Sequence, residues 1–276
     1  MLDNRSGNAF SEKPFFDREF IARNKISKLQ GQFTYKKPGE VMRATQYKYV
    51  YSFDNLGRLI ASFETRKDDG TTDTTWNKYT YTNDHLLAEH WKGDKKGYNG
   101  VRYTYDDRNR VVREDYMSSY RDSLGKSHQT IINSEQMTYQ DGDHQEKKTY
   151  LNSYGLPYME EVAIWNNLGY LTERTKYYLM TSAQTKLVYE YSDKGYLASI
   201  KNYENGAQEL IEEIKFEYDE YGSLKEKQLH KKGKYITETE ILYNDKSHLL
   251  TYVVTRDVAT NYMMILGFKE YAYFND

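Results

Sequence analysis

The sequence predicts an all-β protein: a long antiparallel meander of tandem β-hairpins, twisted and curled into a partial shell or half-pipe. Three observations lead to this class. Aromatic residues alternate with polar ones, a short hairpin phrase recurs, and 30 of the 276 residues are Tyr. A period of two is typical of strands that pack one face. We expect about sixteen to eighteen strands, and a sheet of that size curls rather than staying flat.

The recurring phrase is clearest in Tyr51-Ser-Phe-Asp-Asn-Leu-Gly-Arg-Leu59. Asp54 occupies the position where a β-turn begins, because its carboxylate can accept hydrogen bonds from backbone N–H groups of the turn. Gly57 suits the left-handed conformation that closes such a loop. The phrase therefore predicts a strand, a tight turn and a second strand.

Simple alternation after this turn predicts which residues face the packed side. The packed set is Leu59, Ala61 and Phe63, and the outward set is Arg58, Ile60, Ser62 and Glu64. Arg58 is accordingly expected on the outward face.

Seven copies of the phrase align on the aromatic residue before the turn. These residues are Phe53, Tyr81, Tyr105, Trp165, Tyr191, Tyr218 and Tyr243. The glycine position holds Gly57, His85, Asn109, Gly169, Gly195, Gly222 and Ser247. The residue that starts the second strand is Leu59, Leu87, Val111, Leu171, Leu197, Leu224 or Leu249. Tyr139 and Tyr273 mark poorer copies, and the mean spacing of about 27 residues indicates a repeat array.

The phrase resembles the YD repeat of bacterial Rhs-type proteins, which also occurs in insecticidal toxin complexes and animal teneurins. The clearest copies are Tyr51 to Leu59, Tyr103 to Val111 and Phe216 to Leu224. The resemblance covers most of residues 33–276, although the period is longer and the Arg after the Gly position survives only as Arg58 and Arg110. It implies a secreted or cell-envelope protein whose strands wind into a hollow shell without catalytic residues.

Taken in order, residues 1–24 are predicted to form an N-terminal arm or a short capping helix within 11–24. Residues 25–276 form the YD-like hairpin array. The repeat at 113–150 is degraded, which indicates a longer hairpin or a bulging loop, with a domain boundary as the alternative. Further turns should join the repeats at Asp68-Asp69-Gly70, Gly93–Gly97 and Glu204-Asn205-Gly206. A propeller and a MORN-like array are the structural alternatives.

Bulk composition excludes several classes of function. The formal net charge of -2, from 39 basic and 41 acidic residues, gives no electrostatic reason to expect nucleic acid as a partner. The absence of Cys excludes disulfides and thiol catalysis. No apolar run reaches the length of a membrane span, and no signal core precedes the first repeat, so a cytoplasmic location is the alternative to a trimmed secretion signal.

No residue pattern predicts an enzyme, a cofactor or a metal site. The six His have no metal-ligand spacing, and Asp141-Gly-Asp-His144 is only a fragment of a calcium loop. Adjacent pairs such as Glu160 and Glu161 point to opposite faces of a strand, so they do not form an acid–base pair. We expect a non-enzymatic protein with neither cofactor nor metal.

The remaining candidate for binding is the aromatic face, because rows of Tyr and Trp can stack on sugars. The candidate ligand face comprises Tyr49, Tyr51, Trp76, Tyr79, Tyr81, Trp91, Tyr103, Tyr105, Trp165, Tyr189 and Tyr191. The same rows can instead hold neighbouring strands together. The sequence thus favours a surface or secreted scaffold that binds a glycan or a protein. The alternatives are a shell segment that shields another polypeptide and, third, a carbohydrate-active enzyme with a dispersed site.

Overall fold

The computed structural model describes residues 1–68, 71–94, 97–122, 125–204 and 208–275. Over these residues the chain forms one short helix and eighteen strands. The elements are α1 (Arg18–Arg23), β1 (Ile26–Lys36), β2 (Arg43–Phe53), β3 (Leu59–Asp68), β4 (Thr71–Tyr81), β5 (Leu87–Gly93), β6 (Tyr98–Tyr105), β7 (Val111–Arg121), β8 (Ser127–Gly142), β9 (Gln145–Leu151), β10 (Pro157–Trp165), β11 (Leu171–Tyr178), β12 (Gln184–Tyr191), β13 (Leu197–Glu204), β14 (Glu209–Tyr218), β15 (Leu224–Lys231), β16 (Lys234–Tyr243), β17 (Leu250–Asp257) and β18 (Met263–Tyr273). The prediction of an all-β protein built from antiparallel hairpins is confirmed. The turns expected at Asp68-Asp69-Gly70, Gly93–Gly97 and Glu204-Asn205-Gly206 fall wholly or partly outside the described residues.

The strand pairing closes on itself. Among the described strands, each pairs with the next one in the chain, and β1 pairs with both β2 and β18. An even number of strands lets the first and last pair antiparallel, so both sheet edges find hydrogen-bond partners. The pairing of β1 with β18 differs from the unpaired edges that an open half-pipe would leave on these two strands. The propeller alternative is wrong, because these strands belong to one sheet rather than to separate blades.

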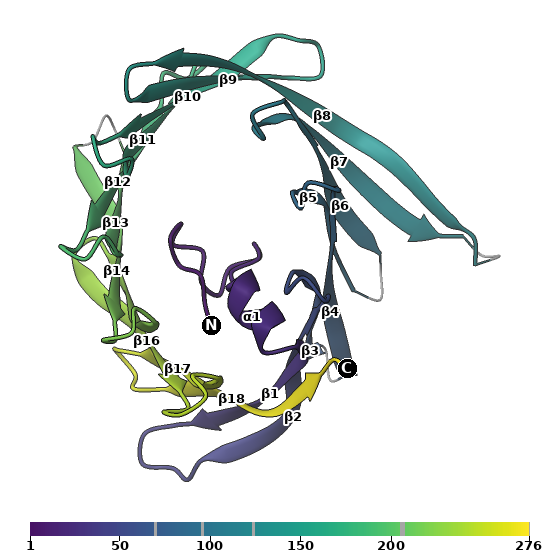
Figure 1. Cartoon of the computed structure of the whole chain (residues 1–276), viewed down its shortest axis with the longest axis vertical. Coiled ribbons are helices and arrows are strands. Elements are labelled where there is room, and N and C mark those ends of the chain that lie inside the picture. Colours follow the sequence, from purple (N-terminus) through teal and green to yellow (C-terminus); the bar gives the residue numbers. More distant parts are fainter. Residues whose placement is uncertain (69–70, 95–96, 123–124, 205–207, 276) are drawn as a thin grey trace. The chain divides into compact units, whose positions relative to one another are not determined.

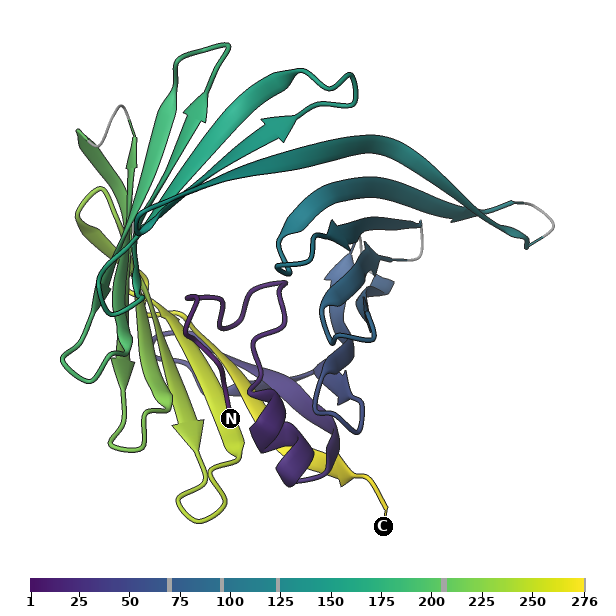
Figure 2. The same cartoon turned by 45° about the horizontal axis from the view of Figure 1, so that its top comes forward.

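The chain divides into two compact units. Unit 1 comprises Met1–Thr75, Glu190–Ile200 and Glu212–Asp276, and unit 2 comprises Trp76–Tyr189 and Lys201–Ile211. The degraded stretch lies in unit 2, where β7 and the sixteen-residue β8 form a long hairpin (Figure 2).

The repeat phrase folds as its residues predict. Asp54 Oδ1 accepts hydrogen bonds from the backbone N–H groups of Leu56 and Arg58, at 3.0 and 2.9 Å. Gly57 has a φ of 73°, and His85 and Asn109 occupy the same left-handed region at 65° and 62°. The glycine position is therefore conformationally equivalent in these copies.

Arg58 is not the freely exposed residue that alternation predicts. Its guanidinium binds the Asp54 carboxylate of the same turn, with Nε and Nη2 each 2.7 Å from Oδ2, and only 18% of the side chain is exposed. The aspartate of the phrase holds both the turn backbone and the arginine that follows it.

A β-bulge follows this turn and reverses the expected face of the second strand. Phe53 pairs with Leu59, but Ser52 pairs with Ala61, so one extra residue lies on β3. Such an insertion moves the following side chains to the other face. Ser62 is consequently buried at 3% exposure, and Glu64 faces the same side as Tyr49 and Tyr51. The outward assignment of Ser62 and Glu64 was therefore wrong. The assignment of Ala61 and Phe63 to the face of Tyr49 and Tyr51 was wrong for the same reason.

Two repeats differ from the alignment made on sequence. The seventh copy, between β16 and β17, has one more residue in its loop. Tyr243 therefore pairs with Leu250 rather than Leu249, and His248 instead of Ser247 has the positive φ. A further copy at Asn152 was missed because Leu151 stands where the aromatic residue usually lies. Asn152 Oδ1 nevertheless accepts the same two backbone hydrogen bonds, from Tyr154 and Leu156.

Tyrosine hydroxyls join successive repeats. Several of these hydroxyls donate to the carbonyl oxygen of the residue that starts the second strand of the preceding repeat. The pairs are Tyr105 to Leu87, Tyr139 to Val111, Tyr243 to Leu224 and Tyr271 to Leu250, at 2.6–2.9 Å. A Phe in place of one of these tyrosines could not make this hydrogen bond to the preceding repeat.

The N-terminal segment supplies much of the core of unit 1. Figure 1 shows α1 and the residues before it on the concave side of β1, β2 and β18. Phe16 packs edge-on against Tyr51 and Phe53, with ring centroids 4.8 and 4.9 Å apart. Ala9 and Ile21 are fully buried. Residues 1–24 therefore cover apolar strand residues of unit 1.

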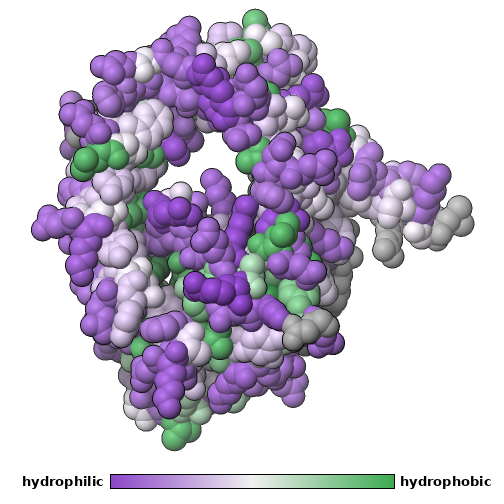
Figure 3. Space-filling view, in the orientation of Figure 1, coloured by the Kyte–Doolittle hydropathy of each residue, from purple (hydrophilic) through white to green (hydrophobic). Residues whose placement is uncertain are grey.

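Unit 2 has its own small core of Met137, Tyr150 and Met159. Hydrophilic residues dominate the face of the molecule in Figure 3, consistent with a mean hydropathy of -0.94. Within the described ranges, no helix has the length and apolar character needed to cross a membrane.

Candidate functional site

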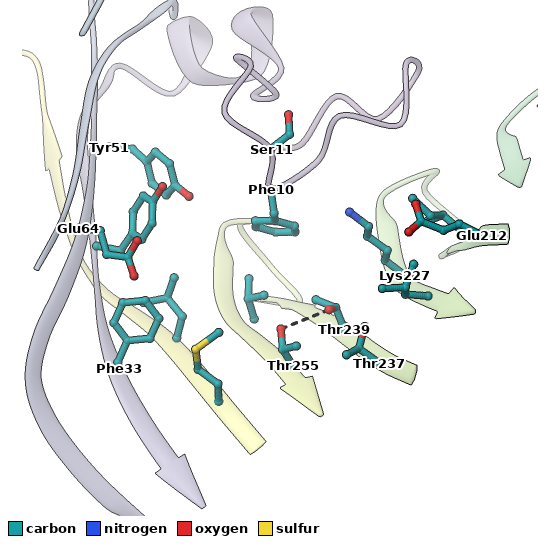
Figure 4. Close-up of a pocket in the computed structure, with 16 residues that line it drawn as sticks. Phe10, Ser11, Phe33, Tyr51, Glu64, Glu212, Lys227, Thr237, Thr239 and Thr255 are labelled. Carbon is teal, nitrogen blue, oxygen red and sulfur yellow. Dashed lines mark hydrogen bonds between the residues drawn. The ribbon is translucent and has the colours of Figure 1, made fainter. Parts of the chain in front are cut away.

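Unit 1 contains a cavity of about 480 Å³, a volume in the range of small-molecule sites. Every residue that lines it belongs to unit 1. Its floor is formed by β1 and β16 to β18, its walls by β2, β3, β14 and β15, and Phe10 and Ser11 of the N-terminal segment close the remaining side (Figure 4).

The floor consists of two rows of side chains that cross neighbouring strands. Directly paired residues form an apolar row of Val253, Leu266 and Phe33, which Ile241 continues beyond the cavity lining. The second row, two residues further along each strand, contains Thr239, Thr255 and Met264. Directly opposite residues on an antiparallel sheet have their side chains on the same face, so this continuous surface follows from register.

One wall is aromatic. Tyr49 and Tyr51 lie with ring centroids 4.7 Å apart, and Tyr51 is only 4% exposed because Phe15 and Phe16 cover it. Burial raises the pKa of the Tyr49 hydroxyl. Glu64 pairs with Tyr49 across β2 and β3 and adds a carboxylate to this wall.

The opposite wall carries the positive charge of the site. Lys227 and Leu229 on β15 alternate with outward residues, as do Glu212 and Ile214 on β14. Lys227 Nζ donates one long hydrogen bond, 3.4 Å, to the carbonyl of Ala9. Burial lowers the pKa of Lys227, and the charge of Glu212 opposes that effect.

Polar side chains also line the cavity: Ser11, Tyr49, Tyr51, Glu64, Glu212, Lys227, Thr237, Thr239 and Thr255. Thr239 and Thr255 bond each other through their hydroxyls at 3.2 Å (Figure 4). Within the described part of the chain, no group of three or more His, Asp or Glu residues is arranged to hold a metal ion. The cavity can accommodate a mainly apolar body together with one or two polar groups.

The eleven aromatic residues predicted as a ligand face do not gather in one place. Tyr49 and Tyr51 line the cavity, and Tyr191 also belongs to unit 1. The others belong to unit 2: Trp76, Tyr79, Tyr81, Trp91, Tyr103, Tyr105, Trp165 and Tyr189.

Several of the unit 2 residues make packing contacts. Tyr79 is 5% exposed and stacks on His90 with ring centroids 4.6 Å apart. Trp91 lies over Gly100, where a Cβ would come within 2.5 Å of the indole, and its Nε1 donates to Glu89. Tyr105 donates to the backbone, and burial raises the pKa of Tyr103 to about 12. Trp76, Tyr81, Trp165, Tyr189 and Tyr191 are half-buried.

Sequence reasoning missed most residues of the cavity. Lys227 follows a bulge, so plain alternation from Leu224 assigns it to the outer face. A signal existed in the repeated turn phrase, because a bulge after the turn shifts the inward positions by one residue.

Unit 2 has a second concentration of charge on β8 to β11. Lys148 lies over the rings of Tyr139 and Tyr150, 5.8 and 4.4 Å from their centroids, and burial lowers its pKa. Glu161 pairs with Lys176. The fragment Asp141-Gly-Asp-His144 forms a hairpin turn, and Asp141 binds Arg108 and Arg110. These groups form a structural ion-pair network.

No protein-family model matches the chain, and the search of curated proteins found no match. A porin-like protein from Bacteroides uniformis is similar in structure, with a TM-score of 0.40 and 8% identity over 88% of this chain and 98% of that chain. TcdB2-TccC3-TEV gives a TM-score of 0.27 and 9% identity over 80% of this chain and 15% of that chain. A LolA superfamily protein from Nitrosomonas europaea gives a TM-score of 0.19 and 8% identity over 94% of this chain and 92% of that chain.

These three TM-scores lie below 0.5, so the likenesses do not establish a shared fold or a shared function. Membership of the YD-repeat family stays a prediction that rests on the repeat phrase.

Proposed function

We propose that the protein is a non-enzymatic binding scaffold that holds a small, largely apolar molecule in the cavity of unit 1. The observation that carries the proposal is the apolar row Val253, Leu266 and Phe33 beneath a cavity of about 480 Å³. Apolar walls with a few placed polar groups are typical of small-molecule sites. Burying the apolar surface of a ligand there provides the driving force for binding.

Filling the cavity tests this function. Thr255→Trp places an indole in the cavity, whereas Tyr252→Trp changes the same strand at a residue that is 38% exposed and packs across Gly267. Binding of the neutral fluorescent probe N-phenyl-1-naphthylamine is measured by titration. We expect wild type and Tyr252→Trp to bind it, and Thr255→Trp to bind at least tenfold more weakly. Equal binding by all three proteins would show that the probe does not use this cavity.

The glycan hypothesis has narrower support. Trp76 and Trp165 are half-buried, so part of each indole could contact a sugar ring. The same titration, repeated with oligosaccharides as competitors, distinguishes a glycan ligand from an apolar ligand of the cavity. A secreted or envelope location, implied by the resemblance to YD repeats, is part of this proposal and is tested by fractionating the source cells.

A second candidate function is enclosure of polypeptide, and one observation favours it. The concave side of unit 1 already binds a segment of its own chain through Asn4, Ala9 and Phe16. If this is the function, a synthetic peptide of residues 1–24 should bind a chain that lacks them.

A further inference from the structure

Resting on the proposed function, we propose that the cavity selects a single-headed anionic amphiphile. Its carboxylate, or a similar oxyanion, binds Lys227, and its apolar chain lies along the row Val253, Leu266 and Phe33. The ligand class is set by Lys227, the one cationic side chain among the described residues that line the cavity, together with the apolar row of the floor.

The charge of Lys227 is incompletely met by the protein. Its hydrogen bond to the Ala9 carbonyl is 3.4 Å long and involves no counter-charge. Glu212 is the acidic residue whose charge favours the protonated lysine, but its Oε2 also lies 3.7 Å from Lys231 Nζ. Burial lowers the pKa of Lys227 in spite of Glu212. A ligand oxyanion would supply the charge-assisted hydrogen bond that the protein itself provides only weakly.

The acidic residues of the cavity set the direction of the ligand. Glu64 lies on the wall opposite Lys227, beside Tyr51, whereas Glu212 lies on the Lys227 side (Figure 4). Glu64 would repel an anionic head on its wall, whereas on the opposite wall the positive charge of Lys227 offsets that of Glu212. These three are the charged residues that line the cavity within the described part of the chain.

The apolar tail of the ligand would lie along the row Val253, Leu266 and Phe33. Val253 and Leu266 are each 8% exposed and Phe33 is 5% exposed, so the row is a continuous packed surface rather than a set of mobile side chains. Met264 borders it, and its flexible thioether can adapt to tails of different shape. A molecule with polar groups along its whole length would lose hydrogen bonds to water on this floor.

The test compares three probes of equal chain length: decanoate, decanol and decyltrimethylammonium. Each displaces N-phenyl-1-naphthylamine from wild type and from two variants. Lys227→Met removes the cavity cation. Lys215→Met is the matched control, because Lys215 lies on β14 between Ile214, which lines the cavity, and the buried Phe216, and its own side chain is exposed.

We expect wild type to prefer decanoate over decanol. Lys227→Met should weaken decanoate binding by about tenfold or more, because the loss of one hydrogen bond to a charged group lowers affinity by about that factor. The affinity for decanol should stay unchanged. Lys215→Met should change neither. Equal affinity of wild type for decanoate and decanol would overturn the anion selectivity alone, and a preference for decyltrimethylammonium would replace it with a cation site at Glu64. Failure of the neutral probe and decanol to bind at all would instead remove the proposed function.

Discussion

At the scale of single residues, glycine has two separate roles in the turns. Gly57 has a φ of 73°, and a Cβ there would also come within 2.1 Å of the Arg18 carbonyl oxygen in α1. Gly169 has a φ of 79° but nothing within 4 Å of the corresponding position. Gly57 therefore permits both the left-handed turn and the close contact with α1, whereas Gly169 permits the turn alone.

This difference gives a matched pair of substitutions. Gly169→Ala should cost about 1–2 kcal/mol of unfolding free energy, the usual penalty of a left-handed non-glycine residue. Gly57→Ala should cost clearly more, because the methyl group also displaces α1. Urea denaturation measures both. Equal losses would mean that the helix adjusts freely and that its contact with the turn contributes little.

The tyrosine hydroxyls that join repeats make a second residue-scale prediction. Tyr243→Phe removes the 2.9 Å hydrogen bond to the Leu224 carbonyl and leaves the ring in place. We expect a loss of about 0.5–1.5 kcal/mol, the usual net value of one hydrogen bond. Tyr252→Phe, at an exposed ring, is the control and should change stability little. The prediction fails if the two variants unfold at the same urea concentration.

The buried charge of Lys227, which we propose binds the ligand, should lower the unfolding free energy of the protein. Because burial lowers its pKa, the folded state holds this proton less tightly than the unfolded state does. The penalty is complete below the lowered folded pKa and is relieved as pH rises from there through the unfolded value of about 10.4. Lys227→Met should therefore gain stability relative to wild type at neutral pH, and that gain should shrink toward alkaline pH.

Thermal denaturation over a pH series measures this difference. Lys215→Met serves again as the control and should show no such trend. A gain for Lys227→Met that stays constant from neutral to alkaline pH would reflect methionine packing rather than the buried charge.

At the scale of elements, the N-terminal segment acts as part of the core. Leu197 is 2% exposed, and the space beside it is closed by Gly7 of this segment. Phe15 is 3% exposed and meets Tyr51 edge-on. Unit 1 thus buries apolar strand residues against a segment that has little regular structure.

Removal of residues 1–24 should lower the melting temperature and expose Tyr51 and Phe53. Binding of an environment-sensitive dye such as ANS should increase, because these rings lose the cover of Phe16. Adding the peptide of residues 1–24 should reverse both changes. A truncated chain that melts like wild type would show that the segment is only a surface attachment.

At the scale of the whole molecule, closure of the pairing depends on strand number. β18 pairs with both β17 and β1, so it protects one edge of each. A chain without Met263–Tyr273 would have an odd number of strands, and β17 could meet β1 only in parallel. Two exposed edges are templates for pairing with other chains.

We therefore expect a chain that ends before Met263 to self-associate, as measured by light scattering during size-exclusion chromatography. A chain that ends at Phe274 keeps all of β18 and is the control. A monomeric truncated chain would contradict the role of β18 in protecting the sheet edges.

The sequence by itself determined the local structure of this protein. Asp54 and Gly57 specify a turn through hydrogen bonds and a left-handed φ within five residues, and the same chemistry identifies the turns at His85 and Asn109. Alternating aromatic residues predicted strands, and the spacing of the turns predicted hairpins. Local interactions suffice for these features, because each involves residues that are close in the chain.

Only the tertiary structure decided which face carries the site and where the sheet ends. A single bulge residue after the turn reverses the side on which Ser62, Glu64 and Lys227 lie, and their residue types alone do not reveal this. The pairing of β1 with β18 joins residues more than 200 positions apart, such as Phe33 and Leu266. The cavity arises where these non-local pairings meet the N-terminal segment, so its residues share no motif that the sequence alone could reveal.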